Sequence, residues 1–227
     1  MHVVVSESAQ AAGDAAAEAI AAGLIAAVED RGQASIALSG GTTPAGMVSR
    51  LASLSLPWGR VHIFQVDERV VAVDDPARNW LSLLPLVKRV PVTHRHPMPV
   101  ETVDGDRVYA TELGEVTGSP PVLDVAHLGL GADGHTASLV PGDHTIDIVD
   151  RDVCWTDEYQ GHSRLTLSLP VLAAARRQIW LVTGASKASA VRELTAATSD
   201  SPAARVAANG SPTLFLDADA AALTGLA

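Results

Sequence analysis

A glycine-rich segment near the middle of the chain holds the residues best suited to proton transfer. Residues 129–135 read Gly-Leu-Gly-Ala-Asp-Gly-His, so Asp133 stands two positions before His135. Glycines free the backbone to turn both side chains inward. Histidine titrates near neutral pH, so His135 can accept and return a proton, and Asp133 can orient its ring. We interpret the segment as a catalytic pair, with Thr136 and Ser138 as further donors; the alternative is a surface turn capped by Asp133.

A second segment has the residue types that bind phosphate. Residues 39–43 read Ser-Gly-Gly-Thr-Thr and follow a predicted strand. Two glycines let the backbone approach a ligand closely, and the amides of the loop and of the next helix can point at an anion. We expect Ser39, Gly40, Gly41 and Thr42 to form a phosphate cradle. The segment matches neither a Walker loop nor a dinucleotide fingerprint, and the alternative is an ordinary strand-to-helix turn.

Charged residues at three other places could complete an anionic site. Asp67-Glu68-Arg69 follows an apolar run, Arg164 opens another, and Lys187 follows Thr183-Gly184. Arginine suits bidentate contact with phosphate or carboxylate. In open α/β sheets, ligands bind beyond the carboxyl ends of the strands, which is where most of these polar segments are predicted to lie. We therefore expect Asp67, Arg69, Arg164 and Lys187 to converge on one cleft.

The composition limits the classes of partner. The chain has 227 residues, 47% of them hydrophobic, and a formal net charge of -10 with no Lys/Arg cluster. Nucleic-acid binders need a basic surface, so no nucleic-acid partner is expected. The Ala-rich stretch 9–28 is interrupted by Asp14 and Glu18, which favours a soluble helix over a membrane span. The N-terminus lacks the pattern of a signal peptide, and the single cysteine, Cys154, fits a reducing cytosol.

The histidines, serines and single cysteine outside these segments match no other catalytic motif. Eight histidines are present, but none belongs to a His-Glu-x-x-His motif; His94 and His96 could chelate a metal but lie in a proline-flanked loop. A Gly-x-Ser-x-Gly elbow is absent, so no Ser-His-Asp triad is indicated by sequence. Nothing around Cys154 suggests an activated thiolate. We expect no catalytic metal.

Apolar runs and helical patterns alternate along the chain. Strands are predicted at 3–5, 35–38, 61–66, 125–128, 163–168, 178–182 and 213–216. Helices are predicted at 8–31, from near 45, from near 79, at 104–116, at 187–197 and after the last strand. Gly32 is placed to end the first helix. This order predicts one α/β domain, residues 1–227, with a mostly parallel sheet and helices on both faces.

These segments, in this order, resemble the glucosamine-6-phosphate isomerase/6-phosphogluconolactonase family. The resemblance rests on segments 38–44, 66–69, 128–139, 163–166, 182–187 and 216–221 and on Asn79. It implies a Rossmann-like fold shared with ribose-5-phosphate isomerase. It also implies hydrolysis of the lactone of a phosphorylated sugar acid in the pentose phosphate pathway, without a cofactor. Such a protein is expected to be cytoplasmic, with a small-molecule substrate, and to be a monomer or small homo-oligomer.

The resemblance also assigns expected roles. His135 would activate water, Arg164 and Lys187 would carry the phosphate, and Asp67 would hold sugar hydroxyls or a nearby cation. Arg69 would bind phosphate or stabilise the oxyanion. The chain departs from the family at residues 71–73 and at Arg78, beside the site.

Two other functions stay open at this point. Deaminases of the same family continue the histidine loop into an Asn-Glu-Pro segment, whereas residues 137–142 here read Ala-Ser-Leu-Val-Pro-Gly, which favours the lactonase. A sugar-phosphate sensor would use the same cradle without turnover. The sequence leaves open whether the loop at 90–100 closes over a ligand.

Overall fold

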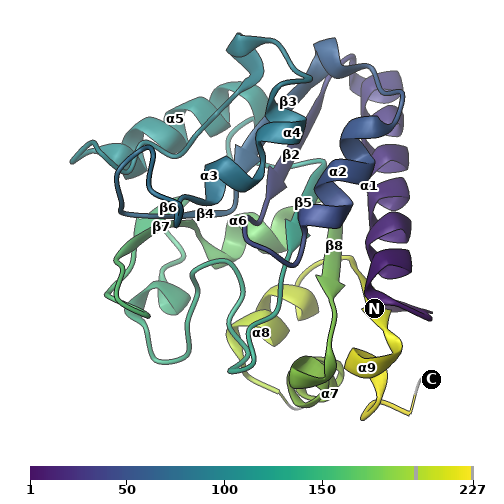
Figure 1. Cartoon of the computed structure of the whole chain (residues 1–227). Helices are drawn as coiled ribbons and strands as arrows, with labels where there is room; N and C mark the ends of the chain where they lie inside the picture. Colours follow the sequence, from purple (N-terminus) through teal and green to yellow (C-terminus); the bar gives the residue numbers. More distant parts are fainter. Residues whose placement is uncertain (197–198, 226–227) are drawn as a thin grey trace.

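The main sheet has six strands, all parallel, as the alternation of apolar runs predicts. The computed structural model describes residues 1–196 and 199–225, and its strand order is β1-β9-β8-β5-β2-β3. Figure 1 labels β8, β5, β2 and β3 of this sheet. The strands are β1 (His2–Ser6), β2 (Ala34–Leu38), β3 (Val61–Gln65), β5 (Val125–Leu128), β8 (Arg177–Val182) and β9 (Pro212–Asp217). From β2 the chain continues to β3 on one side, whereas from β5 it continues to β8 on the other, so the strand order reverses between β2 and β5. Such a switch point is where open α/β sheets bind ligands.

Helices cover both faces of this sheet. Those on one face are α1 (Ala9–Arg31), α2 (Ala45–Ser53), α3 (Asn79–Ser82) and α4 (Leu84–Val87). Those on the other are α5 (Gly105–Thr117), α6 (Leu169–Ala174), α7 (Ala188–Thr195), α8 (Pro202–Ala208) and α9 (Ala218–Ala221). Single 3₁₀ turns lie at Trp58–Arg60, Val92–His94, His144–Asp147 and Ala185–Lys187.

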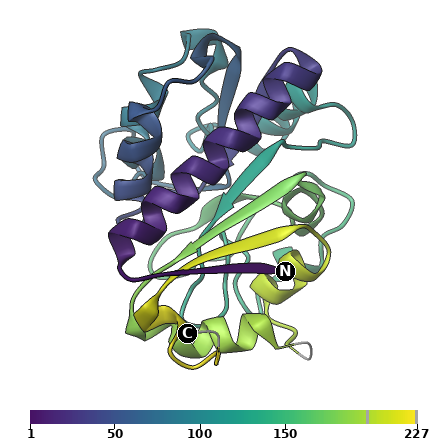
Figure 2. The ribbon, with the colours of Figure 1, turned by 90° about the vertical axis from the view of Figure 1, so that its right-hand side faces the viewer.

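The longest helix, α1, begins and ends where the sequence predicts. Ser8 Oγ accepts from Ala11 N at 3.2 Å, and Gly32 takes the left-handed conformation with φ 81°, donating its amide to Val28 O. By length and composition alone α1 could cross a membrane. Instead it runs diagonally across the main sheet (Figure 2), and its buried face packs on that sheet as a core helix does.

Successive side chains along each strand point to opposite faces of the sheet, so the hydrophobic core has two parts, one on each face. In β8, Trp180 and Val182 pack with α5 to α9, whereas Ile179 and Leu181 pack with α1 and α2. Since parallel strands covered on both sides expose neither face, their sequences are apolar throughout rather than alternating. Helical layers thereby pack on both faces of the strands that carry the carboxyl-end loops.

A second, antiparallel sheet was not predicted. It contains β4 (Asp67–Arg69), β7 (Arg164–Leu167) and β6 (Val153–Trp155), in the order β4-β7-β6. Val66 joins the two sheets, because its amide donates to Leu38 O at 3.1 Å while its carbonyl accepts from Leu167 N at 2.8 Å. Asp67 to Arg69, expected only as a charged segment after the strand at 61–66, thus form a strand of their own, and the strand predicted at 163–168 is β7, which pairs antiparallel with it.

Element ends differ slightly elsewhere. The helix predicted at 187–197 is α7, which spans Ala188–Thr195 after a 3₁₀ turn; the final predicted residue, Ala197, lies outside the described residues. The short elements β6, α4, α6 and α8 were not predicted, since three to seven residues carry too little periodicity to be recognised.

Candidate active site

A cavity opens at the carboxyl ends of the parallel strands, at the switch point. Its volume is about 840 Å³. Every predicted site residue except Asp133 lines it: Ser39, Gly40, Gly41, Thr42, Asp67, Arg69, His135, Arg164 and Lys187. The cavity is also lined by residues that the sequence did not indicate as site residues, among them Asn79, His127, Gln160 and Thr183. Segments far apart in the chain thus meet in one cleft, as predicted.

His135 lines this cavity and forms a close pair with Asp133. His135 Nδ1 lies 2.6 Å from Asp133 Oδ1, and the aspartate also accepts from the His135 amide at 3.3 Å. A carboxylate facing Nδ1 can only accept, so the ring proton belongs on Nδ1 and the lone pair on Nε2. Nε2 has no hydrogen-bond partner among the described residues. The imidazole is therefore oriented with its basic nitrogen unoccupied.

Tyr159 is a third member of this group. Its hydroxyl donates to Asp133 Oδ2 at 2.9 Å, and its ring contacts His135 edge-on with centroids 5.5 Å apart. Desolvation raises the pKa of Asp133, but the hydrogen bonds from His135 and Tyr159 outweigh it, so that pKa lies below its usual value. Asp133 is held as a carboxylate between two donors.

A tight hairpin turn brings Tyr159 to the site. Tyr159 N donates to His162 O at 3.0 Å, and Gln160 and Gly161 both have positive φ, at 52° and 81°. Two positive φ values at the centre mark a type I′ turn. The Gln-Gly dipeptide was a weak hint of this turn, but nothing local linked it to Asp133.

Gly131 leaves the space that the Asp133–His135 pair occupies. A Cβ at Gly131 would lie 2.0 Å from His135 Nδ1 and 2.5 Å from Asp133 Oδ1. The loop is closed by Gly131 N donating to His135 O at 2.8 Å and by Thr136 Oγ1 donating to Gly129 O at 2.8 Å. Thr136 therefore holds the loop together, whereas it was expected to donate to a ligand.

Asp67 and Glu68 have different roles although they are adjacent. Asp67 lines the cavity and accepts from Ser138 Oγ at 2.6 Å, so Ser138 also serves the protein rather than a ligand. Glu68 is fully buried and accepts from the amides of Asn79 and Trp80 at 2.7 and 2.8 Å. Glu68 thereby fixes the start of α3, and with it the Asn79 side chain at the cavity wall.

Two arginines supply positive charge. Arg69 Nη1 donates to Ala77 O at 2.6 Å and to Asn79 Oδ1 at 3.2 Å. Arg164 stacks over the Tyr159 ring at 5.3 Å and donates to Tyr159 O at 3.3 Å. Burial lowers the pKa of Arg164, and its Nε is buried without a partner among the described residues. A buried guanidinium with an unused donor is suited to receive an anion.

The glycine-rich loop is partly engaged within the protein. Gly41, at φ 104°, donates its amide to Ser82 Oγ at 3.1 Å, and Ser39 Oγ donates to His127 O at 3.1 Å. These two groups are occupied, contrary to expectation. The amides of Gly40, Thr42 and Thr43 have no acceptor among the described residues. They are the part of the cradle that is open to an anion.

Lys187 is positioned by a carboxylate from the next strand. Gly184 N donates to Asp217 Oδ1 and Oδ2 at 2.9 and 3.0 Å, and the same carboxylate accepts from Ala220 N at 2.8 Å. Asp217 therefore caps α9 and fixes the loop after β8, which leads into the 3₁₀ turn ending at Lys187. Residues 216–221, one of the segments on which the family resemblance rests, therefore support the loop that carries Lys187 although none of them lines the cavity.

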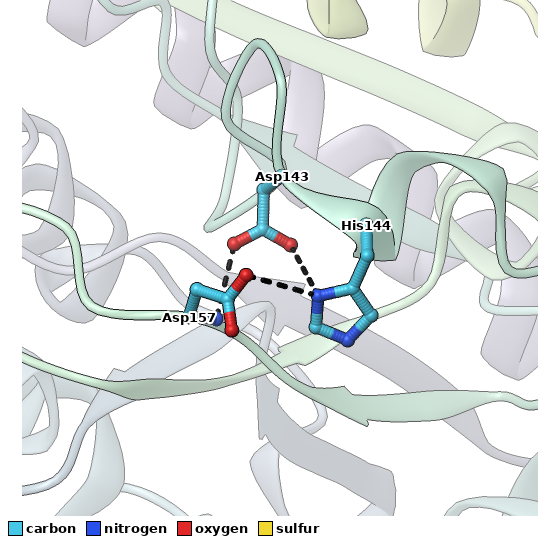
Figure 3. A group of neighbouring side chains, drawn as sticks. All are labelled: Asp143, His144 and Asp157. Atoms are coloured by element: carbon cyan, nitrogen blue, oxygen red, sulfur yellow. Dashed lines mark hydrogen bonds and ion pairs between the residues drawn. The ribbon is translucent and has the colours of Figure 1, made fainter.

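Among the described residues, one group has the spacing of metal ligands. Figure 3 shows Asp143, His144 and Asp157, whose ligand atoms all lie within 4.8 Å of one another. Asp143 already accepts from Thr145 N at 2.8 Å and from Asp157 N at 3.1 Å. None of the three lines the cavity. Hydrogen bonding within the protein accounts for this cluster.

Comparisons with known proteins agree with this geometry. A family model described as "Glucosamine-6-phosphate isomerases/6-phosphogluconolactonase" matches residues 7–215. A 6-phosphogluconolactonase of Synechocystis sp. is 38% identical over 188 residues, covering 77% of this chain and 76% of the relative. One from Nostoc sp. is 32% identical over 210 residues, covering 86% and 87%. The solved 6-phosphogluconolactonase of Trypanosoma brucei superposes with a TM-score of 0.86 at 27% identity, covering 100% of this chain and 98% of that one.

Proposed function

The chain belongs to the glucosamine-6-phosphate isomerase/6-phosphogluconolactonase family, in which it is a 6-phosphogluconolactonase of the pentose phosphate pathway, and we propose that His135 is its general base. The observation that carries this proposal is the 2.6 Å contact between Asp133 and His135 Nδ1, which leaves Nε2 as the basic atom in the cavity. No other part of the cleft pairs a histidine with a carboxylate among the residues that line or contact it.

A δ-lactone is an activated ester, so its hydrolysis needs a positioned water, a base and stabilisation of one negative charge. His135 Nε2 takes a proton from water as the water oxygen bonds to C1. The carbonyl oxygen becomes an oxyanion. When the bond between C1 and the ring oxygen breaks, His135 returns the proton to that oxygen. General base catalysis of this kind is worth ~10²–10⁴-fold in rate.

Backbone amides and cationic side chains bind the negative charges of the substrate. The free amides of Gly40, Thr42 and Thr43 receive the phosphate, and Lys187 adds charge. Arg69 and Arg164 bind the remaining negative charge of the substrate and of the oxyanion. Because the whole chain carries a net charge of -10, these few cations determine the local potential of the cleft.

Asp67 also lines the cavity. It is buried near Arg164, and its negative charge stabilises the charged form of that guanidinium. Its carboxylate is held by Ser138 and faces the cavity, where sugar hydroxyls can donate to it.

The deaminase reaction of the same family is disfavoured by the residues after His135. The deaminase pattern needs an acid there, whereas Leu139 and Val140 are buried apolar residues in this chain. The first carboxylate after the loop, Asp143, caps a 3₁₀ turn outside the cavity lining. A second proton-transfer group of the kind needed for ring opening is missing from this part of the site.

One assay tests the proposal. Purified protein is mixed with freshly prepared 6-phosphogluconolactone, and acid release is followed against the spontaneous hydrolysis of the lactone. We expect rapid release above that background and none of ammonia from glucosamine 6-phosphate. Ammonia release would indicate a deaminase, and binding of 6-phosphogluconate without lactone turnover would indicate a sensor.

A further inference from the structure

His127 is a buried histidine whose role is not explained by the reaction steps above. Its residue is 1% exposed, yet it lines the cavity. Both ring nitrogens, Nδ1 and Nε2, are buried and have no hydrogen-bond partner among the described residues. Buried polar groups normally have partners, so an imidazole with neither nitrogen satisfied calls for a ligand.

The backbone of β5 places His127 directly below the phosphate loop. His127 pairs with Leu38 of β2 and with Ile179 of β8, near the carboxyl ends of these strands. Its carbonyl accepts from Ser39 N at 3.2 Å and from Ser39 Oγ at 3.1 Å. The first residue of the loop at 39–43 is thus bonded to the residue whose side chain forms part of the cavity floor.

The side chain lies on the face of the sheet that carries α2. Ala126 and Leu128 pack on the opposite face, and Val125, two residues before His127, packs with α1 and α2. Side chains alternate along a strand, so His127 faces the layer into which residues 39–45 lead. Its cross-strand neighbours Leu38 and Ile179 are apolar and offer its ring no hydrogen bond.

The chemistry of this ring suits binding and not base catalysis. Burial lowers the pKa of His127 to about 4, so the imidazole is neutral at physiological pH and has one N–H donor and one acceptor. Within the described part of the chain no carboxylate hydrogen-bonds to it, in contrast to His135. A neutral donor at the floor of an anion cradle adds a hydrogen bond without a charge of its own.

We propose that His127 is a further substrate-binding residue, whose ring N–H donates to the phosphate group of the sugar lactone from the floor of the cavity. This inference rests on the proposed function, which sets the phosphate against the amides of Gly40, Thr42 and Thr43. In the absence of ligand the donor stays unsatisfied or bonds only to water, and the phosphate replaces that contact. Binding of the phosphate therefore gains the free energy of giving a partner to a buried donor that otherwise lacks one.

The test compares His127→Leu with His127→Gln. Leucine removes the donor, whereas the glutamine amide retains one. We measure kcat and KM for the lactone, and the Kd of two probes by calorimetry: 6-phosphogluconate, and gluconate, which lacks the phosphate. For His127→Leu we expect KM and the Kd of 6-phosphogluconate to rise about tenfold, the loss of one hydrogen bond to a charged group. We expect kcat within about twofold, no change for gluconate, and partial recovery in His127→Gln.

Stability supplies a second measurement. Because leucine removes an unsatisfied polar group, the melting temperature of ligand-free His127→Leu should not fall, while the rise that 6-phosphogluconate produces should shrink. An unchanged Kd for 6-phosphogluconate, or equal weakening for gluconate, would overturn the assignment. Should His127→Leu fail to fold, the side-chain ¹⁵N signals of His127 in the unmodified protein decide: they must shift on adding 6-phosphogluconate and not on adding gluconate. Absent lactone turnover by the unmodified protein would defeat the proposed function instead.

Discussion

Arg69 and Arg164 lie directly opposite each other across the antiparallel β4–β7 pair. Like charges at such positions are destabilising. Their side chains turn to different supports, Arg69 toward Ala77 and Asn79, and Arg164 toward Tyr159. Both residues line the cavity, and the negative charges of Asp67 and Glu68 partly offset the repulsion of Arg164 by Arg69. An unfavourable pair in the free protein becomes favourable when an anion binds between or beside the two groups.

Removing either arginine should therefore impair the reaction strongly. We expect Arg69→Gln and Arg164→Gln each to lower kcat/KM on the order of 10²-fold, the typical effect of losing one preorganised donor to an oxyanion or phosphate. The lysine variants should recover only part of it, because an ammonium lacks the planar fork. Steady-state kinetics separate the roles: a residue that binds phosphate mainly raises KM, and one that stabilises the oxyanion mainly lowers kcat. Full activity in either lysine variant would contradict the geometric part of this prediction.

Replacing His135 tests the base directly. His135→Ala should lower kcat by about 10²–10⁴-fold with KM nearly unchanged, because the residue acts on water and not on substrate binding. Asp133→Asn should lower kcat as well, since an amide can donate to Nδ1 and so favour the wrong tautomer. Rates are measured with fresh lactone after subtraction of spontaneous hydrolysis. Unchanged turnover in His135→Ala would remove this residue from the mechanism.

Gly131→Ala tests whether the pair needs the space beside it. The added Cβ would lie 2.0 Å from His135 Nδ1, so the ring or the loop must move. A displacement of this size in a catalytic group commonly costs about 10²-fold in rate. Gly129→Ala is the matched control in the same loop, because a Cβ at Gly129 has nothing within 4 Å. We expect a far smaller loss for Gly129→Ala, and equal losses in the two variants would mean that the loop responds only to reduced backbone freedom.

The sequence was sufficient to predict the strands of the main sheet, most of the helices and several residues that line the cavity, because these depend on local patterns. The apolar runs of β2, β5 and β8 and the glycines that follow them are short-range signals. Where the chain leaves the parallel sheet at Val66, local pattern was insufficient. The three-residue strand β4 exists because β7, nearly a hundred residues later, pairs with it, and no local rule predicts that pairing.

The same limit applies to the site. Asp133 and His135 are two residues apart, so their contact could be predicted, whereas Tyr159 reaches Asp133 from 26 residues away. The sequence also did not show which hydroxyls form hydrogen bonds within the protein. Thr136, Ser138 and Ser39 are polar residues beside a cavity, yet each donates to the protein itself, because buried backbone and carboxylate acceptors must be satisfied first.

Glu68→Gln should destabilise the fold more than it alters the chemistry of the cleft. Glu68 accepts four hydrogen bonds and lies 3.6 Å from Arg78 Nε, and both side chains are buried. Breaking a buried ion pair costs roughly 3–5 kcal/mol when one charge is left unpaired. Urea unfolding at neutral pH measures this loss.

Glu101→Gln is the control for that experiment. Glu101 also pairs with Arg78, at 2.6 Å, but its side chain is 51% exposed. Exposed ion pairs contribute about 0–1 kcal/mol. Arg78, one of the departures from the family pattern, donates to Glu101 and to Val71 O and lies beside the buried carboxylate of Glu68. A larger loss in Glu101→Gln than in Glu68→Gln would contradict the prediction that the buried ion pair contributes more.

Acid should weaken the edge of the main sheet through a stack of histidines. His62 on β3 stacks on His94 with centroids 4.0 Å apart, and His62 Nδ1 lies 3.0 Å from His96 Nε2. Burial, and next the charge of His94, lower the pKa values of both His62 and His96 to about 4. The unfolded chain therefore binds more protons than the native protein between the unperturbed value of 6.5 and about 4. Their contribution to stability is complete above pH 6.5 and is lost progressively as the pH falls toward 4.

Urea unfolding at a series of pH values between 7.5 and 4.5 measures this effect. The free energy of unfolding of the unmodified protein should fall across this range, and the double variant His62→Gln, His96→Gln should show a shallower fall, whatever its stability at pH 7.5. Part of the slope must remain, because buried His127 also has its pKa lowered to about 4. His2→Gln, at an exposed position, serves as the control and should keep the full slope. An unaltered slope in the double variant would show that the histidine stack takes up no protons before the protein unfolds, and would leave the acid sensitivity to His127 and the carboxylates.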